Sequence, residues 1–219
     1  MLLSVVAAIG CGVACGVLVF AESRGLARLR IAAKLVASAA FVTIGALALA
    51  GGSSAFTRWM FGGLVLGAIG DAALLGRSKR AFLAGLVAFL LGHLAYVVGI
   101  AQIEPVERWY ADAGLTALLP LGAGALALAV LWRRLGSLRV PVILYVATII
   151  TMVIAALAAN RGHALPWPRC LYLGVGATLF FASDLAVARD RFVGRAFSNK
   201  LWGLPVYYAG QLLIAWALG

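Results

Sequence analysis

The sequence predicts an all-α, polytopic membrane protein with eight transmembrane helices, and three observations lead to this fold class. Of the 219 residues, 64% are hydrophobic and 11% are charged, and the mean hydropathy is +1.06, far above the values of soluble globular domains. The chain divides into eight apolar runs of about 20 residues, the length that crosses a bilayer core of roughly 30 Å. Basic residues gather in every second connection between these runs.

The eight predicted helices follow one another with short polar connections. The first run lacks the basic segment that precedes the apolar part of a signal peptide, so we interpret it as a membrane helix. Little chain remains outside the runs, and residues 1–219 are expected to form a single integral membrane domain. The predicted helices cover residues 2–20, 31–51, 57–76, 81–103, 114–132, 140–160, 169–188 and 201–218.

The net charge of +11 indicates membrane topology and not a nucleic-acid partner, because the basic residues follow the helices. Thirteen of them fall on one side of the predicted membrane, and four fall on the other side together with three acidic residues. By the positive-inside rule the thirteen-residue side is cytoplasmic, and both termini lie outside the cell membrane. Attraction to anionic membrane lipids is a secondary effect. The thirteen are Arg24, Arg28, Arg30, Arg77, Lys79, Arg80, Arg133, Arg134, Arg139, Arg189, Arg191, Arg195 and Lys200.

Two aspartates in apolar helices are the strongest candidates for function. Asp71, in the third run, and Asp184, in the seventh, each lie about five residues, or roughly 8 Å, from the predicted cytoplasmic end. Ionisable residues inside the membrane are rare, costly and functional candidates by default. An unpaired carboxylate at this depth has no packing role, so both are predicted to be site residues.

Two further helices carry ionisable residues in the same inner half of the membrane. Lys34 of the second run is either a site residue or a snorkelling lysine that reaches the interface. His93 of the fourth run is either a site residue or a hydrogen-bonded packing histidine, and Tyr96 lies three residues further on the same helix face.

Four polar residues of the sixth and eighth runs enter from the same side. Tyr145, Tyr207 and Tyr208 are either site residues or interfacial aromatics. Gln211 is either a site residue or a polar contact between helices. Together these depths predict one polar pocket that opens toward the cytoplasmic leaflet.

Two local patterns bear on how the aspartates are placed. Gly63 and Gly67 form a GxxxG pattern followed by Gly70, which predicts a flat helix face for close helix contact, with Asp71 turned away from lipid. The stretches IGDAALLGRSKRAF and ASDLAVARDRFVGRAF also resemble each other. The third and seventh helices run in the same direction, so this likeness is consistent with a parallel four-plus-four helix repeat.

Four motifs in a fixed order give the chain a family resemblance. They are GD in GLVLGAIGDAALL (63–75), HxxY in FLAGLVAFLLGHLAYVVG (82–99), SD in GATLFFASDLAVA (176–188) and YYxxQ in PVYYAGQLLIA (205–215). In this order the chain resembles the YhhN-like lysoplasmalogenase family. It departs from the pattern at Gly67, where relatives often have serine.

The resemblance implies an eight-helix hydrolase that cleaves the vinyl ether bond of lysoplasmalogens. The products would be a fatty aldehyde and glycerophosphoethanolamine or glycerophosphocholine. The family's polar residues fall on Asp71, His93, Tyr96, Tyr145, Asp184, Tyr208 and Gln211, with Lys34 at the position of its helix-two lysine.

The chemistry of a vinyl ether agrees with these residues. The bond resists bases and nucleophiles but breaks when an acid protonates the carbon distal to oxygen, which leaves an oxocarbenium ion for water to capture. Two carboxyl groups in a pocket can divide this work: the protonated one donates its proton, and the ionised one stabilises the cation and positions water. Lys34 and the loop arginines are candidates to hold the lipid phosphate, and the apolar helix faces are candidates for the alkenyl chain.

The expected partners are a lysophospholipid substrate and membrane lipids, with no nucleic acid, no metal and no cofactor. The chain has two histidines, and His163 falls in a predicted extracellular loop, so a three-histidine zinc site is excluded. The alternative function is a small proton-coupled transporter or lipid flippase whose paired aspartates carry protons. A scaffold protein would leave the two carboxyl groups unexplained.

Overall fold

The structure is a computed structural model that describes residues 1–76 and 78–219. These described residues form α-helices and no β-strand, as predicted for the fold class. Eight of the helices are long, and α5 is a short helix between α4 and α6. The helices are α1 (Leu2–Arg24), α2 (Ala27–Gly51), α3 (Ala55–Ala73), α4 (Lys79–Ile100), α5 (Trp109–Ala113), α6 (Leu118–Leu131), α7 (Arg139–Arg161), α8 (Arg169–Ala188) and α9 (Phe197–Trp216).

The eight long helices correspond in order to the eight predicted segments. The observed start differs from the predicted one by four residues at three helices: α2 begins at Ala27, α9 at Phe197 and α6 at Leu118. At the fifth segment the difference arises because Gly114–Ala117 forms a 3-10 turn ahead of α6. Gly114 stands between α5 and this turn, and its φ of 54° lies in the left-handed region that glycine adopts without a steric penalty. Hydropathy alone does not register such a turn.

Six segments among the described residues are long and apolar enough to cross a membrane. They are α1, α2, α4, and the stretches Val106–Arg134, Gly136–Arg161 and Arg169–Val193. Helices α3 and α9 are not in this set, so the crossing of the membrane by all eight helices stays a prediction, as does the four-plus-four repeat.

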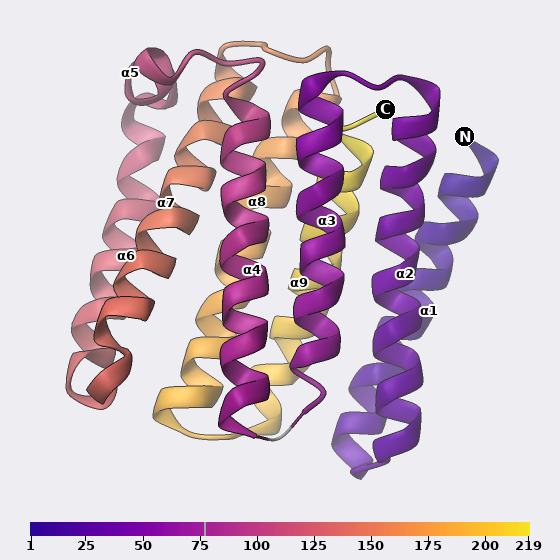
Figure 1. Ribbon diagram of the computed structural model, residues 1–219, viewed down its shortest axis with the longest axis vertical. Coiled ribbons are helices and arrows are strands. Elements are labelled where there is room, and N and C mark those ends of the chain that lie inside the picture. The colour runs from indigo at the N-terminus through magenta and orange to yellow at the C-terminus, as the bar shows by residue number, and fades with distance from the viewer. Residues whose placement is uncertain (77) are drawn as a thin grey trace.

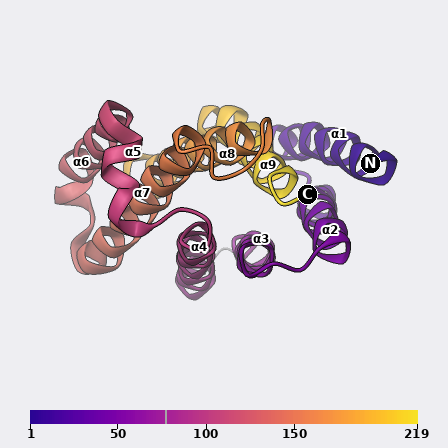
Figure 2. The same ribbon diagram turned by 90° about the horizontal axis from the view of Figure 1, so that it is seen from above.

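Seen from above, the helices stand in two rows (Figure 2). Helices α1, α9, α8 and α7 form one row, α2, α3 and α4 form the other, and α6 stands at the end beside α7. Helix α9 packs against α8, α1 and α2, and α4 closes the other side against α7. The interior between the rows is where the polar side chains of several helices meet.

The glycine face of the third predicted helix lies at helix contacts, as the GxxxG pattern predicted. A Cβ atom added at Gly63 would collide with the Tyr96 ring of α4, and one at Gly67 would collide with the Gln211 amide of α9. The two glycines therefore let side chains from α4 and α9 approach the α3 backbone, close to Asp71.

Four connections that carry the basic residues lie at one end of the molecule (Figure 1). They join α1 to α2, α3 to α4, α6 to α7 and α8 to α9, and both chain termini lie at the opposite end. Arg77, one of the thirteen basic residues, lies outside the described residues. The charge pattern in the sequence thus follows the alternation of the helices, and it separates one end of the fold from the other.

Candidate functional site

A cavity of about 490 Å³ extends inward from the end with the basic connections. Five predicted site residues from five helices line it: Lys34 of α2, Asp71 of α3, Tyr145 of α7, Asp184 of α8 and Tyr207 of α9. Its outer part is lined by charged residues of the connections, and apolar side chains such as Phe89, Ile149 and Phe181 line the rest. The two aspartates therefore share one cavity.

Asp71 is buried and ion-paired. Its carboxylate Oδ1 lies 2.8 Å from the Lys34 ammonium, and its Oδ2 accepts a hydrogen bond of 2.7 Å from the Ser38 hydroxyl. The Lys34 side chain is 12% exposed and turns toward the carboxylate, so it does not snorkel to the interface. The expectation of an unpaired carboxylate does not hold at Asp71, because a cation one helix away compensates its charge.

Asp184 has different neighbours. Its Oδ2 accepts a hydrogen bond of 2.6 Å from the Tyr145 hydroxyl and lies 3.9 Å from Nε2 of His93. No lysine or arginine among the described residues pairs with it. The two carboxyl groups of the cavity thus differ in character: one faces an ammonium, and the other faces a phenol and an imidazole.

His93 is fully buried behind Asp184 and does not line the cavity. Its ring packs edge-on against Tyr145, with centroids 5.2 Å apart, and against Phe180, with centroids 4.7 Å apart. Neither ring nitrogen has a hydrogen-bond partner among the described residues. The sequence alternative of a hydrogen-bonded packing histidine is therefore not what the structure has, because its polar atoms point to no acceptor or donor other than the nearby carboxyl group.

A hydrogen-bonded chain connects three further predicted residues on the α3 side of α9. The Tyr96 hydroxyl donates to Gln211 Oε1 at 2.9 Å, and Gln211 Nε2 donates to the Tyr207 hydroxyl at 3.2 Å. Tyr207 lines the cavity, whereas Tyr96 and Gln211 do not line it and are connected to Tyr207 through these hydrogen bonds. Tyr208 points elsewhere, into a groove between α1 and α9, and its hydroxyl donates to the Lys34 carbonyl at 3.4 Å.

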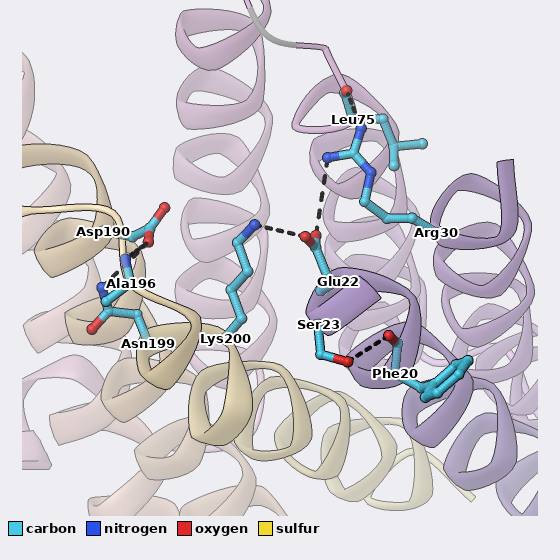
Figure 3. Close-up of polar contacts among 9 residues, drawn as sticks. All are labelled: Phe20, Glu22, Ser23, Arg30, Leu75, Asp190, Ala196, Asn199 and Lys200. Carbon is cyan, nitrogen blue, oxygen red and sulfur yellow. Dashed lines mark hydrogen bonds and ion pairs between the residues drawn. The ribbon is translucent and has the colours of Figure 1, made fainter. Parts of the chain in front are cut away.

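Sequence reasoning missed Ser38 and the charged cluster at the outer end of the cavity. Ser38 lies one helical turn after Lys34, so the i, i+4 spacing was a usable signal. The cluster joins Glu22 of α1 to Arg30 of α2 and Lys200 of α9 (Figure 3). Glu22 and Lys200 are 178 residues apart, so no local pattern indicates that they meet.

Within residues 1–76 and 78–219, no group of three or more histidine, cysteine, aspartate or glutamate side chains is placed to hold a metal ion. The polar groups of the cavity are instead suited to proton transfer and to the binding of charged groups. An amine, a phenol, an imidazole and two carboxyl groups lie along or directly behind one surface.

The fold and the site define a multi-pass α-helical membrane protein with a charged cavity at one end of its helices. The chain belongs to the YhhN family, whose model matches residues 29–218. No solved structure matches the chain significantly.

Three curated relatives illustrate the family. The chain is 35% identical over 159 residues to "Lysoplasmalogenase TMEM86A" of Bos taurus, and this match covers 71% of this chain and 63% of that protein. It is 34% identical over 168 residues to a "Lysoplasmalogenase" of Mycobacterium tuberculosis, covering 72% of this chain and 59% of the relative. It is 29% identical over 165 residues to an "Uncharacterized membrane protein YhhN" of Escherichia coli O157:H7, and this match covers 75% of this chain and 76% of the relative. The chain thus spans less than two thirds of the length of the two lysoplasmalogenases.

Proposed function

We propose that this protein is a membrane hydrolase that cleaves the vinyl ether bond of lysoplasmalogens. The observation that carries the proposal is that one buried aspartate, Asp71, and one partly buried aspartate, Asp184, line the same cavity with different partners. Relatives named lysoplasmalogenase support the substrate class. The products are a fatty aldehyde and glycerophosphoethanolamine or glycerophosphocholine.

The different partners of the two carboxyl groups assign their roles. Asp184 has no paired cation among the described residues, and it is the carboxylic acid that donates a proton to carbon. Asp71 is ion-paired with Lys34 at 2.8 Å, and its carboxylate is the anion that faces the developing positive charge. Tyr145 holds the Asp184 carboxyl group in place through its hydrogen bond of 2.6 Å.

The reaction balances with one water molecule. The Asp184 proton passes to the alkenyl carbon distal to oxygen, and the proximal carbon becomes an oxocarbenium ion. Water adds to that carbon and returns a proton to the Asp184 carboxylate, which restores the acid and leaves a hemiacetal. The hemiacetal then breaks its bond to the glycerol oxygen, which takes up the proton of the hemiacetal hydroxyl. Glycosidases use a similar pair of carboxyl groups to form and stabilise a related oxocarbenium-like transition state.

Hydrolysis in deuterated water tests this route directly. Because the acid's exchangeable proton becomes part of the product, one turnover is expected to place one deuterium at carbon two of the aldehyde. Purified protein is incubated with lysoplasmenylethanolamine, the aldehyde is trapped at once by borohydride reduction, and the alcohol is analysed by mass spectrometry. Unlabelled aldehyde is incubated in parallel to correct for enolisation.

Each alternative predicts a different product. Hydrolysis of an ester or phosphodiester bond places no deuterium at this carbon. A proton-coupled transporter or flippase, the rival function for paired intramembrane aspartates, releases no aldehyde at all. Aldehyde without deuterium at carbon two would contradict the general-acid role of Asp184.

We also propose that the end with the basic connections faces the cytoplasm and that both termini face outward, because of the positive-inside rule. On a background in which Cys11, Cys15 and Cys170 are replaced by alanine, a cysteine at Lys79 is expected to resist an impermeant thiol reagent in intact cells, and a cysteine at Val106 is expected to react. Permeabilised cells serve as the control, in which both positions react. Labelling of position 79 from outside intact cells would show that the protein has the opposite orientation.

A further inference from the structure

Three charged residues from three helices meet at the outer end of the cavity (Figure 3). The Lys200 ammonium lies 2.7 Å from Glu22 Oε2, and Arg30 Nη1 lies 4.0 Å from Glu22 Oε1. Arg30 Nη2 also donates to the Leu75 carbonyl at 3.2 Å, which fixes the guanidinium toward the end of α3. A single carboxylate is therefore bracketed by two cations, and all three side chains line the same cavity as the aspartates.

The exposure of the charged side chains falls from this cluster toward Asp71. Lys200 is 37% exposed, Glu22 is 16% exposed, Lys34 is 12% exposed and Asp71 is 2% exposed. Arg30 and Lys34 are one helical turn apart on α2, a rise of about 6 Å. The cluster thus lies about one helical turn outside the Lys34–Asp71 pair, a length that a glycerol backbone can span.

The cluster has hydrogen-bonding capacity that the protein does not use. Arg30 Nε is buried and has no partner among the described residues, and the contact of Arg30 Nη1 with Glu22 is too long for a hydrogen bond. The accessible donors are therefore Arg30 Nη1 and the Lys200 ammonium, which suit the oxygens of a phosphodiester. Once Lys200 turns to a phosphate, the Glu22 carboxylate loses its close partner and needs another cation.

We propose that Glu22, Arg30 and Lys200 form the headgroup subsite of the cavity, in which the two basic residues bind the phosphate and Glu22 binds the ammonium of a zwitterionic lysolipid. The inference rests on the proposed function for the orientation of the lipid. A phosphate-ammonium headgroup offers an anion to the two cations and a cation to Glu22. A headgroup with a phosphate and no ammonium leaves Glu22 facing a negative group, and this repulsion lowers the affinity of the subsite for that headgroup.

Binding of saturated 1-O-alkyl lysolipids tests the subsite without turnover, because these ethers have no double bond to protonate. Analogues with phosphoethanolamine and phosphoglycerol headgroups are titrated against the full chain in detergent micelles. Glu22→Gln is expected to weaken the phosphoethanolamine analogue about five- to tenfold and to leave the phosphoglycerol analogue unchanged or tighter, as for the loss of one partly exposed charged contact. Lys200→Gln is expected to weaken both analogues. Arg58→Gln is the matched control, because Arg58 lies in the first turn of α3, where it donates to the Ser53 carbonyl, and α3 begins at the end of the molecule away from the basic connections (Figure 1).

Both substitutions break the same Glu22–Lys200 ion pair, so a merely structural link between α1 and α9 would make the two variants shift both analogues alike. That result overturns the proposal, as does equal binding of the two analogues by the wild type. Thermal unfolding of each variant shows whether it is folded, and a variant that unfolds early is replaced by Glu22→Asp or Lys200→Arg, which keep the charge and are expected to retain the preference.

Two further measurements are made. One distinguishes a lipid headgroup from a free phosphate compound as the ligand, and the other distinguishes failure of the subsite from failure of the proposed function. Soluble phosphocholine is expected to compete only weakly, and competition as strong as that of the alkyl lysolipid would overturn the lipid assignment of the subsite. Aldehyde release from lysoplasmenylethanolamine is measured in parallel. Headgroup discrimination without aldehyde release refutes the proposed function alone, and aldehyde release without headgroup discrimination refutes the subsite alone.

Discussion

Replacement of Asp184 by asparagine is expected to lower kcat for vinyl ether hydrolysis by about 100- to 10,000-fold, the contribution typical of a general acid. Asparagine keeps the size of the side chain and can still accept the hydrogen bond from Tyr145, but it has no acidic proton to give to carbon. Because Asp184 has no paired cation among the described residues, its neutralisation leaves no ammonium or guanidinium group without a partner. The loss is therefore expected in kcat, with a stable fold.

The measurement is aldehyde release under saturating lysoplasmenylethanolamine, together with binding of a saturated alkyl analogue to show that the cavity is intact. Asp112→Asn in α5 is the matched control, since it makes the same chemical change at the end of the molecule away from the basic connections. Turnover by Asp184→Asn at a rate near that of the wild type would show that another group donates the proton.

Replacement of Asp71 by asparagine is expected to affect stability as well as turnover. The Lys34 ammonium is then left in a nearly buried position without its carboxylate at 2.8 Å. Loss of one partner from a buried ion pair costs about 3 to 5 kcal/mol in the free energy of unfolding. The variant is also expected to be inactive, because the anion that faces the oxocarbenium ion is gone.

A double variant separates these two effects. In Asp71→Asn with Lys34→Met, neither charge remains, so most of the lost stability is expected to return while turnover stays absent. Unfolding in detergent with increasing denaturant gives the free energies, and aldehyde release gives the activity. Hydrolysis by the double variant would show that Asp71 serves only to neutralise Lys34.

The fold could be predicted from the sequence to the level of its helices, because apolar runs of bilayer length and alternating basic connections are local signals. The glycine face of α3 was also predictable, since Gly63 and Gly67 are spaced for close helix contact. The start of α6 at Leu118 was not, because the 3-10 turn at Gly114–Ala117 leaves hydropathy unchanged.

Five of the predicted residues that line the cavity could be found from the sequence, but their arrangement could not. Depth along each helix placed Asp71 and Asp184 in one layer, and both line one cavity. Rotation about each helix axis is set by tertiary packing, and it decides that Tyr207 lines this cavity while Tyr208 lines another groove. The pairing of Lys34 with Asp71 depends on the same rotation, so the sequence left snorkelling open as an alternative.

The ion pair between Lys34 and Asp71 joins helices that are consecutive in the chain, and this has a consequence for biosynthesis. Helix α3 is not among the segments that qualify as membrane spans by length and hydropathy, whereas α2 is. Since α2 is made first and packs against α3, the two can leave the translocation channel as a hairpin whose opposite charges already neutralise each other. For the predicted crossing of the membrane by α3, the ion-pair partner of Asp71 in the folded protein would thereby also be the group that lowers the cost of placing this helix in the bilayer.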